Sequence, residues 1–145
     1  MRVKGRVGIC TGSASGIGLA TALKLASEGA RIVLADIDPK GLAAAQKQIE
    51  AAGQSDVESS VCDVSKESEV ERTVDLAIAR FGQLDIVVNN AGLMLFKPIE
   101  EQTEEDWRLI LNVDLLGAFF YTKQAFLKMK AGGSIVNVSS IHAVE

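Results

Sequence analysis

A glycine-rich segment near the amino terminus, residues 11–18, constrains the fold more than any other part of the sequence. It reads TGSASGIG, it follows the short apolar run 7–10, and helix-forming residues come directly after it. This order predicts a sharp turn from a buried strand into a helix. Glycines let the backbone turn tightly and approach a pyrophosphate, and the first amide groups of the helix face the anion. The segment therefore favours a phosphate-binding turn.

The glycine spacing, Gly-x-x-x-Gly-x-Gly, differs from the general dinucleotide fingerprint Gly-x-Gly-x-x-Gly. Taken alone, such a turn could equally be a connection that binds nothing. However, a second apolar run at 31–35 ends in Asp36. A carboxylate at this position can accept hydrogen bonds from both ribose hydroxyls of an adenosine. The alternative role of Asp36 is a helix cap, but Asp38 before Pro39 fits that role better.

Apolar runs and amphipathic stretches alternate along the rest of the sequence. Further strands are expected at 57–62, 84–88 and 134–138. Helices are expected at 39–52, from a cap at Ser65 to Phe81, and from Thr103 to about Lys130. This alternation predicts an α/β fold in one domain, 1–145, built as a Rossmann-like doubly wound parallel sheet. The strand 57–62 alternates in polarity and is expected at an edge.

Composition excludes several classes of function. The net charge of −4 offers no basic surface for nucleic acid. Cys10 and Cys62 lie in expected strands without metal-ligand spacing, so we expect buried thiols and no metal site. The amino terminus is too polar for a signal peptide, and the apolar helix 103–130 is too interrupted to span a membrane. A cytoplasmic protein is expected.

Five motifs together resemble the short-chain dehydrogenase/reductase family, and the likeness covers the whole chain. Each motif stands at the expected end of its strand or helix, which makes the set far more specific than any member. The motifs are Thr11-Gly12-x-x-x-Gly16-Ile17-Gly18, Asp63-Val64, Asn89-Asn90-Ala91-Gly92, Asn112-Val113 and Ile135-Val136-Asn137-Val138-Ser139-Ser140.

The resemblance implies an oxidoreductase that uses NAD, with a small alcohol or ketone as substrate. It places the cofactor against residues from four strand ends and the long helix. The residues implied are Gly12, Ser15, Gly16, Ile17 and Gly18 at the pyrophosphate, Asp36 and Ile37 at the adenosine ribose, Asp63 and Val64 at the adenine, and Asn90, Ala91, Gly92 and Val113 at the nicotinamide side.

The resemblance also implies two catalytic residues, Asn112 supporting a proton-relay water and Ser140 polarising the substrate oxygen. The family's general acid and base is a Tyr-x-x-x-Lys pair beyond the serine, and the 145 residues contain none. The single tyrosine, Tyr121, precedes the serine and is followed four positions later by Ala125, so it is expected to pack in the helix. The fold is therefore expected to be incomplete at its carboxyl-terminal side, with cofactor binding but no turnover. The one histidine, His142, is a weaker candidate for the missing base.

Two other functions compete with this one. A methyltransferase would also use a glycine turn and a ribose-binding acid, but it gives no reason for Asn89-Asn90-Ala91-Gly92. A non-catalytic dinucleotide-binding or interaction module follows directly from the missing tyrosine and lysine. A homo-oligomer is expected through the helix 103–130, because it carries apolar side chains around its circumference. These side chains are Leu109, Leu115, Leu116, Phe119, Phe120 and Phe126.

Overall fold

The computed structural model describes residues 1–130 and 132–140. In this part of the chain, five strands form one parallel sheet in the order β3-β2-β1-β4-β5. The strands are β1 Val7–Thr11, β2 Arg31–Asp36, β3 Val57–Val61, β4 Ile86–Asn89 and β5 Ser134–Asn137. The strand order reverses between β1 and β4, which is where open α/β sheets bind ligands. The predicted fold class is confirmed, and β3 does lie at an edge.

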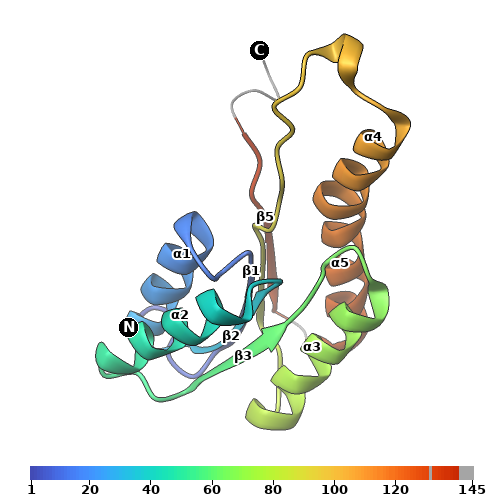
Figure 1. Ribbon diagram of the computed structural model, residues 1–145. Helices are drawn as coiled ribbons and strands as arrows, with labels where there is room; N and C mark the ends of the chain where they lie inside the picture. Colours follow the sequence, from blue (N-terminus) through green and yellow to red (C-terminus); the bar gives the residue numbers. More distant parts are fainter. Residues whose placement is uncertain (131, 141–145) are drawn as a thin grey trace.

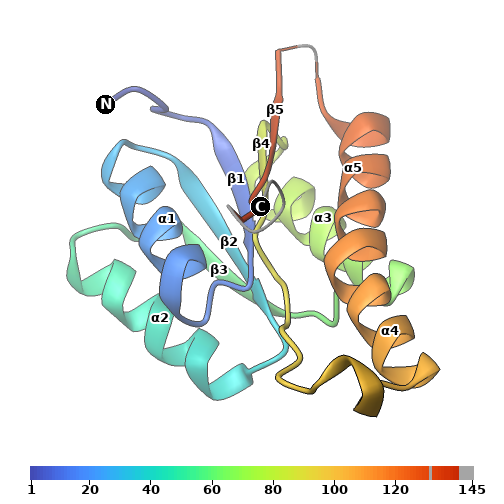
Figure 2. The same ribbon diagram turned by 90° about the horizontal axis from the view of Figure 1, so that it is seen from above.

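Helices cover both faces of the sheet (Figures 1 and 2). The helices α1 Gly16–Ser27 and α2 Pro39–Ala51 pack on one face, and α3 Glu67–Phe81 packs on the other beside α5 Gly117–Lys128. A short 3-10 turn, Ile99–Glu101, precedes α4 Glu104–Ile110, and a π-helical segment, Leu111–Leu116, joins α4 to α5. Within the described residues, no helix is long and apolar enough to cross a membrane.

Each face of the sheet buries its own apolar cluster. The first cluster joins Ile9 and Val33 of the sheet to Val74 of α3, and the second joins Ile32 and Leu34 to α1 and α2. All five of these side chains are fully buried, and each such burial stabilises the fold by about 1.5–3 kcal/mol. The apolar strand sequences follow from this arrangement, because a strand covered on both faces needs apolar side chains on both.

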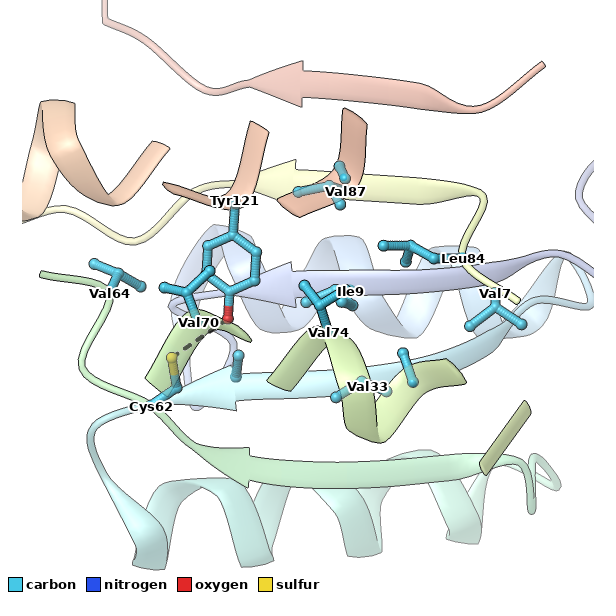
Figure 3. Packing of buried hydrophobic residues seen from close by; sticks show 13 residues of the cluster. Val7, Ile9, Val33, Cys62, Val64, Val70, Val74, Leu84, Val87 and Tyr121 are labelled. Carbon is cyan, nitrogen blue, oxygen red and sulfur yellow. Dashed lines mark hydrogen bonds between the residues drawn. The ribbon is translucent and has the colours of Figure 1, made fainter. Parts of the chain in front are cut away.

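Tyr121 lies in the middle of the first cluster, as expected from the sequence (Figure 3). It is fully buried, and its hydroxyl is 3.4 Å from the thiol of Cys62. Burial raises the pKa of Tyr121 well above its usual value, and it also raises the pKa of Cys62. Burial likewise raises the pKa of Cys10 to about 12. These groups stay neutral near pH 7 and act as core residues.

The carboxylate of Asp85 fastens the amino-terminal end of β1 to the segment before β4. It accepts hydrogen bonds from the Val7 amide at 2.9 Å, from Arg6 Nη1 at 2.7 Å and from Gln83 Nε2 at 2.6 Å. Although burial acts to raise the pKa of Asp85, these three donors hold it below its usual value. The charged form of Asp85 is therefore the one that the fold stabilises.

Two local expectations were wrong. Ser65 does not cap α3, which has Lys66 at its N-cap position and no side-chain cap bond. Both the amide and the hydroxyl of Ser65 instead donate to Asp63 Oδ1, at 3.0 and 2.6 Å, in a local turn that precedes the first residue of α3, Glu67. The long helix expected at 103–130 is interrupted by the π-helical segment, although its ends lie close to the predicted ones.

Candidate functional site

The turn between β1 and α1 needs glycine at two positions for different reasons. Gly12 has φ +63°, and a Cβ there would lie 2.9 Å from both Ala91 Cα and Asn90 Nδ2. Gly18 lies inside the first turn of α1, where a Cβ would collide with the Gly12 carbonyl oxygen and lie 2.7 Å from Asn90 Nδ2. The start of α1 therefore packs directly against the backbone of the turn and the end of β4.

Hydrogen bonds from Asn90 hold this arrangement together. Its Nδ2 donates to the carbonyl oxygens of Thr11 at 3.0 Å and Gly12 at 3.3 Å. In return, Thr11 Oγ1 accepts from the amides of Asn90 and Ala91, both at 2.9 Å. These four hydrogen bonds and a fifth, from Thr11 Oγ1 to the Val88 carbonyl oxygen at 3.3 Å, join the carboxyl ends of β1 and β4 where the strand order reverses.

The amino-terminal end of α1 suits an anion. Ser15 stands at its N-cap without a side-chain cap bond, and the first turn carries no acidic residue. Ser15, Gly16 and Ile17 are exposed. The first amide groups of a 12-residue helix and its positive dipole end are therefore available to a negatively charged group.

Asp36 is at the end of β2, facing the same turn. Its carboxylate accepts from the Ala14 amide at 2.9 Å and from the Asp38 amide at 3.0 Å. Asp38, not Asp36, caps α2 by accepting from the Lys40 amide at 3.0 Å, as expected. The next residue, Ile37, is 70% exposed. This leaves Asp36 a half-buried carboxylate held beside the glycine turn.

Asp63 follows β3 and carries a fixed negative charge. Hydrogen bonds from Ser65 are the largest cause of a pKa below the usual range, and Lys66 Nζ, 3.3 Å from Oδ2, acts in the same direction. The amide of Asp63 donates to Glu69 at the start of α3. The following residue, Val64, is buried against Gly117, where an added Cβ would lie 2.7 Å from Val64 Cγ2.

These strand ends surround one cleft of about 540 Å³. Ten of the thirteen expected cofactor residues line it, namely Gly12, Ser15, Asp36, Ile37, Asp63, Val64, Asn90, Ala91, Gly92 and Val113. The other three, Gly16, Ile17 and Gly18, belong to the first turn of α1 and are not among the lining residues. The lining also includes Cys62, Ser65, Leu93 and Leu109, which sequence reasoning missed although three of them adjoin expected positions.

The two expected catalytic residues stand apart from this lining. Asn112 is an exposed residue of the π-helical segment, and Ser140 is an exposed residue after β5. Neither lines the cleft. His142 lies outside the described residues. Among the residues that the structure does describe, no group of three His, Cys, Asp or Glu side chains could hold a metal ion.

Comparison with known proteins decides the family. The family model described as short chain dehydrogenase matches residues 6–145. The chain belongs to the short-chain dehydrogenase/reductase family.

Two relatives from this family are similar in sequence to this protein over nearly all of its chain. A short-chain dehydrogenase/reductase of Pyricularia oryzae is 41% identical over 97% of this chain and 54% of its own length. The 3-oxoacyl-[acyl-carrier-protein] reductase FabG of Thermotoga maritima is 36% identical over 97% of this chain and 58% of its own length. The chain thus spans little more than half the length of these relatives.

Solved structures show the same fold. A short-chain dehydrogenase/reductase from Burkholderia phymatum, in complex with NAD, has a TM-score of 0.94 and 32% identity. The match covers 100% of this chain and 52% of that one. The parallel sheet with helices on both faces is therefore the fold of short-chain dehydrogenase/reductase structures.

Gly18→Ala tests the packing of the glycine turn. We expect the added methyl group to displace the Gly12 backbone and Asn90, and to weaken NADH binding by more than about tenfold, because the displaced turn no longer presents its amides to the pyrophosphate. Isothermal titration calorimetry measures the binding. Gly53→Ala is the matched control, since Gly53 has φ +86° with nothing within 4 Å of an added Cβ and lies outside the cleft. Equal binding by both variants would contradict the account.

Proposed function

We propose that this chain is the dinucleotide-binding part of an NAD-dependent oxidoreductase acting on a secondary alcohol or ketone. The observation that carries the proposal is the single cleft in which a glycine turn, a ribose-type carboxylate and an Asn-Ala-Gly segment meet. Membership of the family and the NAD complex of one structural neighbour support it. The bound nicotinamide would supply the hydride carrier, and the residues of this chain would bind and orient it.

In this proposal each part of the cofactor has its own residues. The amides of residues 12–18 and the start of α1 hold the pyrophosphate, and Asp36 with Ile37 holds the adenosine ribose. Asp63 and Val64 flank the adenine. Residues 90–92 and Val113 lie along the nicotinamide ribose.

Ser140 and Asn112 are the proposed catalytic residues. A hydroxyl can donate a hydrogen bond to an oxygen that gains charge as hydride arrives, which stabilises the transition state. Asn112 would hold a water for proton transfer. Neither group is acidic enough to deliver the proton itself, and Tyr121 is fully buried in the core. The 145 residues are therefore proposed to bind the cofactor without catalysing turnover.

A non-catalytic dinucleotide-binding or interaction module is the second candidate. It is favoured by one specific observation, the lack of a Tyr-x-x-x-Lys pair in the 145 residues. The two candidates agree on cofactor binding and differ on whether a longer protein containing this chain turns over substrate.

We further propose association with a second copy through the face of the π-helical segment and α5. Leu115 is 61% exposed, Phe119 53% and Phe126 85%, and so large an apolar surface marks an interaction site. We also propose that the chain has no nucleic-acid partner, because its net charge of −4 offers no basic surface. A cytoplasmic location is proposed from the polar amino terminus, and cell fractionation can test it.

One prediction of this proposal concerns the choice between NADH and NADPH. Asp36 is an anion where the 2′-phosphate of NADPH would lie, and two unit charges about 4 Å apart repel by roughly 4 kcal/mol at an effective dielectric near 20. Even a heavily discounted penalty exceeds the about 1.4 kcal/mol that gives tenfold discrimination, so NADH should bind more than about tenfold tighter than NADPH. Asp36→Ser should reduce this preference in calorimetry, whereas the exposed Asp56→Ser should not. Equal affinities in the unsubstituted chain would show that Asp36 has another role.

A second prediction concerns turnover. The 145-residue protein, free of contaminating enzymes, is assayed with NAD and a panel of secondary alcohols by the absorbance of the reduced nicotinamide. We expect no turnover, because the proton-transfer group that contributes typically 10²–10⁴-fold is missing. Robust turnover that survives Ser140→Ala would refute the mechanism. Turnover abolished by His142→Ala would assign the base to that histidine.

Association gives the third prediction. Light scattering at roughly ten to fifty micromolar should find a dimer or larger species, because association would remove the exposed apolar side chains of this face from water. Leu115→Glu should shift the protein toward monomer by placing a charge on the apolar face. Glu105→Ala, an exposed change on α4, serves as the control and should not. A clean monomer of the unsubstituted chain would rule out this surface as a dimer interface.

A further inference from the structure

The segment that leaves the cleft after β4 is held from two sides. Residues 90–93 line the cleft. The chain then runs on to α4 (Figure 2). On one side, Thr11 Oγ1 accepts from the amides of Asn90 and Ala91. On the other side, Asp114 Oδ1 accepts from the Leu93 amide at 2.9 Å. Gly92 lies between these two anchors.

Asp114 also lies close to Gly92. A Cβ at Gly92 would lie 3.4 Å from Asp114 Oδ1, an ordinary van der Waals distance, so the carboxylate is next to the backbone of the loop. An ionised acceptor makes a hydrogen bond roughly twice as strong as a neutral one. Beyond this anchor the loop has little packing, since Met94 is 68% and Phe96 88% exposed.

The π-helical segment brings Asp114 to this position. It carries Val113, which lines the cleft, directly before Asp114. At the end of the segment, Gly117 packs so closely on Val64 that no side chain would fit between them. π-helical turns of this kind occur frequently at functional sites. Here the π-helical segment places Val113 in the lining of the cleft and Asp114 against the loop of residues 90–93, which also lines it.

We propose that Asp114 is a positioning residue that fixes residues 91–93 for the nicotinamide half of the dinucleotide. The inference rests on the proposed cofactor function and deepens it. Asp114 acts through the Leu93 amide and is not among the residues that line the cleft of about 540 Å³. Its effect should therefore fall on the nicotinamide half of the ligand and leave the adenosine half, bound at Asp36 and Asp63, unchanged.

The experiment separates the two halves of the ligand. Calorimetry compares NADH with ADP, which carries only the adenosine and pyrophosphate groups. Asp114→Ala should raise the dissociation constant of NADH roughly tenfold, as expected for losing a hydrogen bond to a charged acceptor, and change that of ADP less than about twofold. Asp114→Asn keeps an acceptor oxygen and should recover NADH binding to within about threefold. The exposed Glu105→Ala on α4 is the control.

A ligand-free measurement accompanies the binding data. Hydrogen exchange followed by NMR should show a protected Leu93 amide in the unsubstituted chain and in Asp114→Asn, and faster exchange in Asp114→Ala. If Asp114→Ala fails to fold, Asp114→Ser, whose shorter side chain withdraws the acceptor from the Leu93 amide, should weaken NADH binding and leave ADP binding unchanged. A merely structural residue would instead change NADH and ADP binding together.

Three results would overturn the proposal. Unchanged NADH binding by folded Asp114→Ala would show that the contact does not matter to the site. Equal weakening of NADH and ADP would show a general structural role. No binding of either ligand by the unsubstituted chain would overturn the cofactor function, and the positioning role with it, whatever the exchange of Leu93.

Discussion

The packing of Gly18 against the Gly12 carbonyl oxygen is the constraint on which the site depends. It brings the first turn of α1 so close to the end of β1 that no side chain fits between them. Asn90 fills the remaining space and donates to the carbonyl oxygens of both Thr11 and Gly12. The glycine turn and the end of β4, which are distant in sequence, are thereby fixed at one point. The helix dipole, the half-buried carboxylate of Asp36 and the loop after β4 all face the same cleft as a result.

The apolar sheet provides the rigid support for this point. Parallel strands buried on both faces leave their polar residues at the ends, so the chemistry of the chain collects at the carboxyl edge. The two cysteines and the tyrosine lie in the core and pack there as neutral side chains, because burial raises their pKa values. In the central strands β1, β2 and β4, the apolar residues therefore form the core and the polar residue at the carboxyl end lies at the edge that carries the site.

Much of this arrangement could be predicted from the sequence because it follows local rules. Apolar runs and glycine turns predicted the alternation of strands and helices along the chain. The Asp38-Pro39 pair correctly predicted the cap of α2. Two features that could not be predicted depend on contacts between residues distant in sequence. The π-helical segment lies where Gly117 meets Val64, and the contact of Asp114 with Leu93 spans 21 positions. The Ser65 prediction failed for a local reason, because α3 has Lys66 at its N-cap and Ser65 donates to Asp63 in the preceding turn.

The central claim is that one cleft at the carboxyl edge binds a dinucleotide along its full length. An NMR titration of the isotope-labelled chain with NADH tests it directly, because each backbone amide reports its own surroundings. The account predicts shifts in the amides of residues 12–18, 36–37, 63–64 and 90–93, with little change in α2 and the far end of α3. Shifts confined to the exposed apolar face of α5, or shifts in the glycine turn without any at residues 90–93, would contradict it.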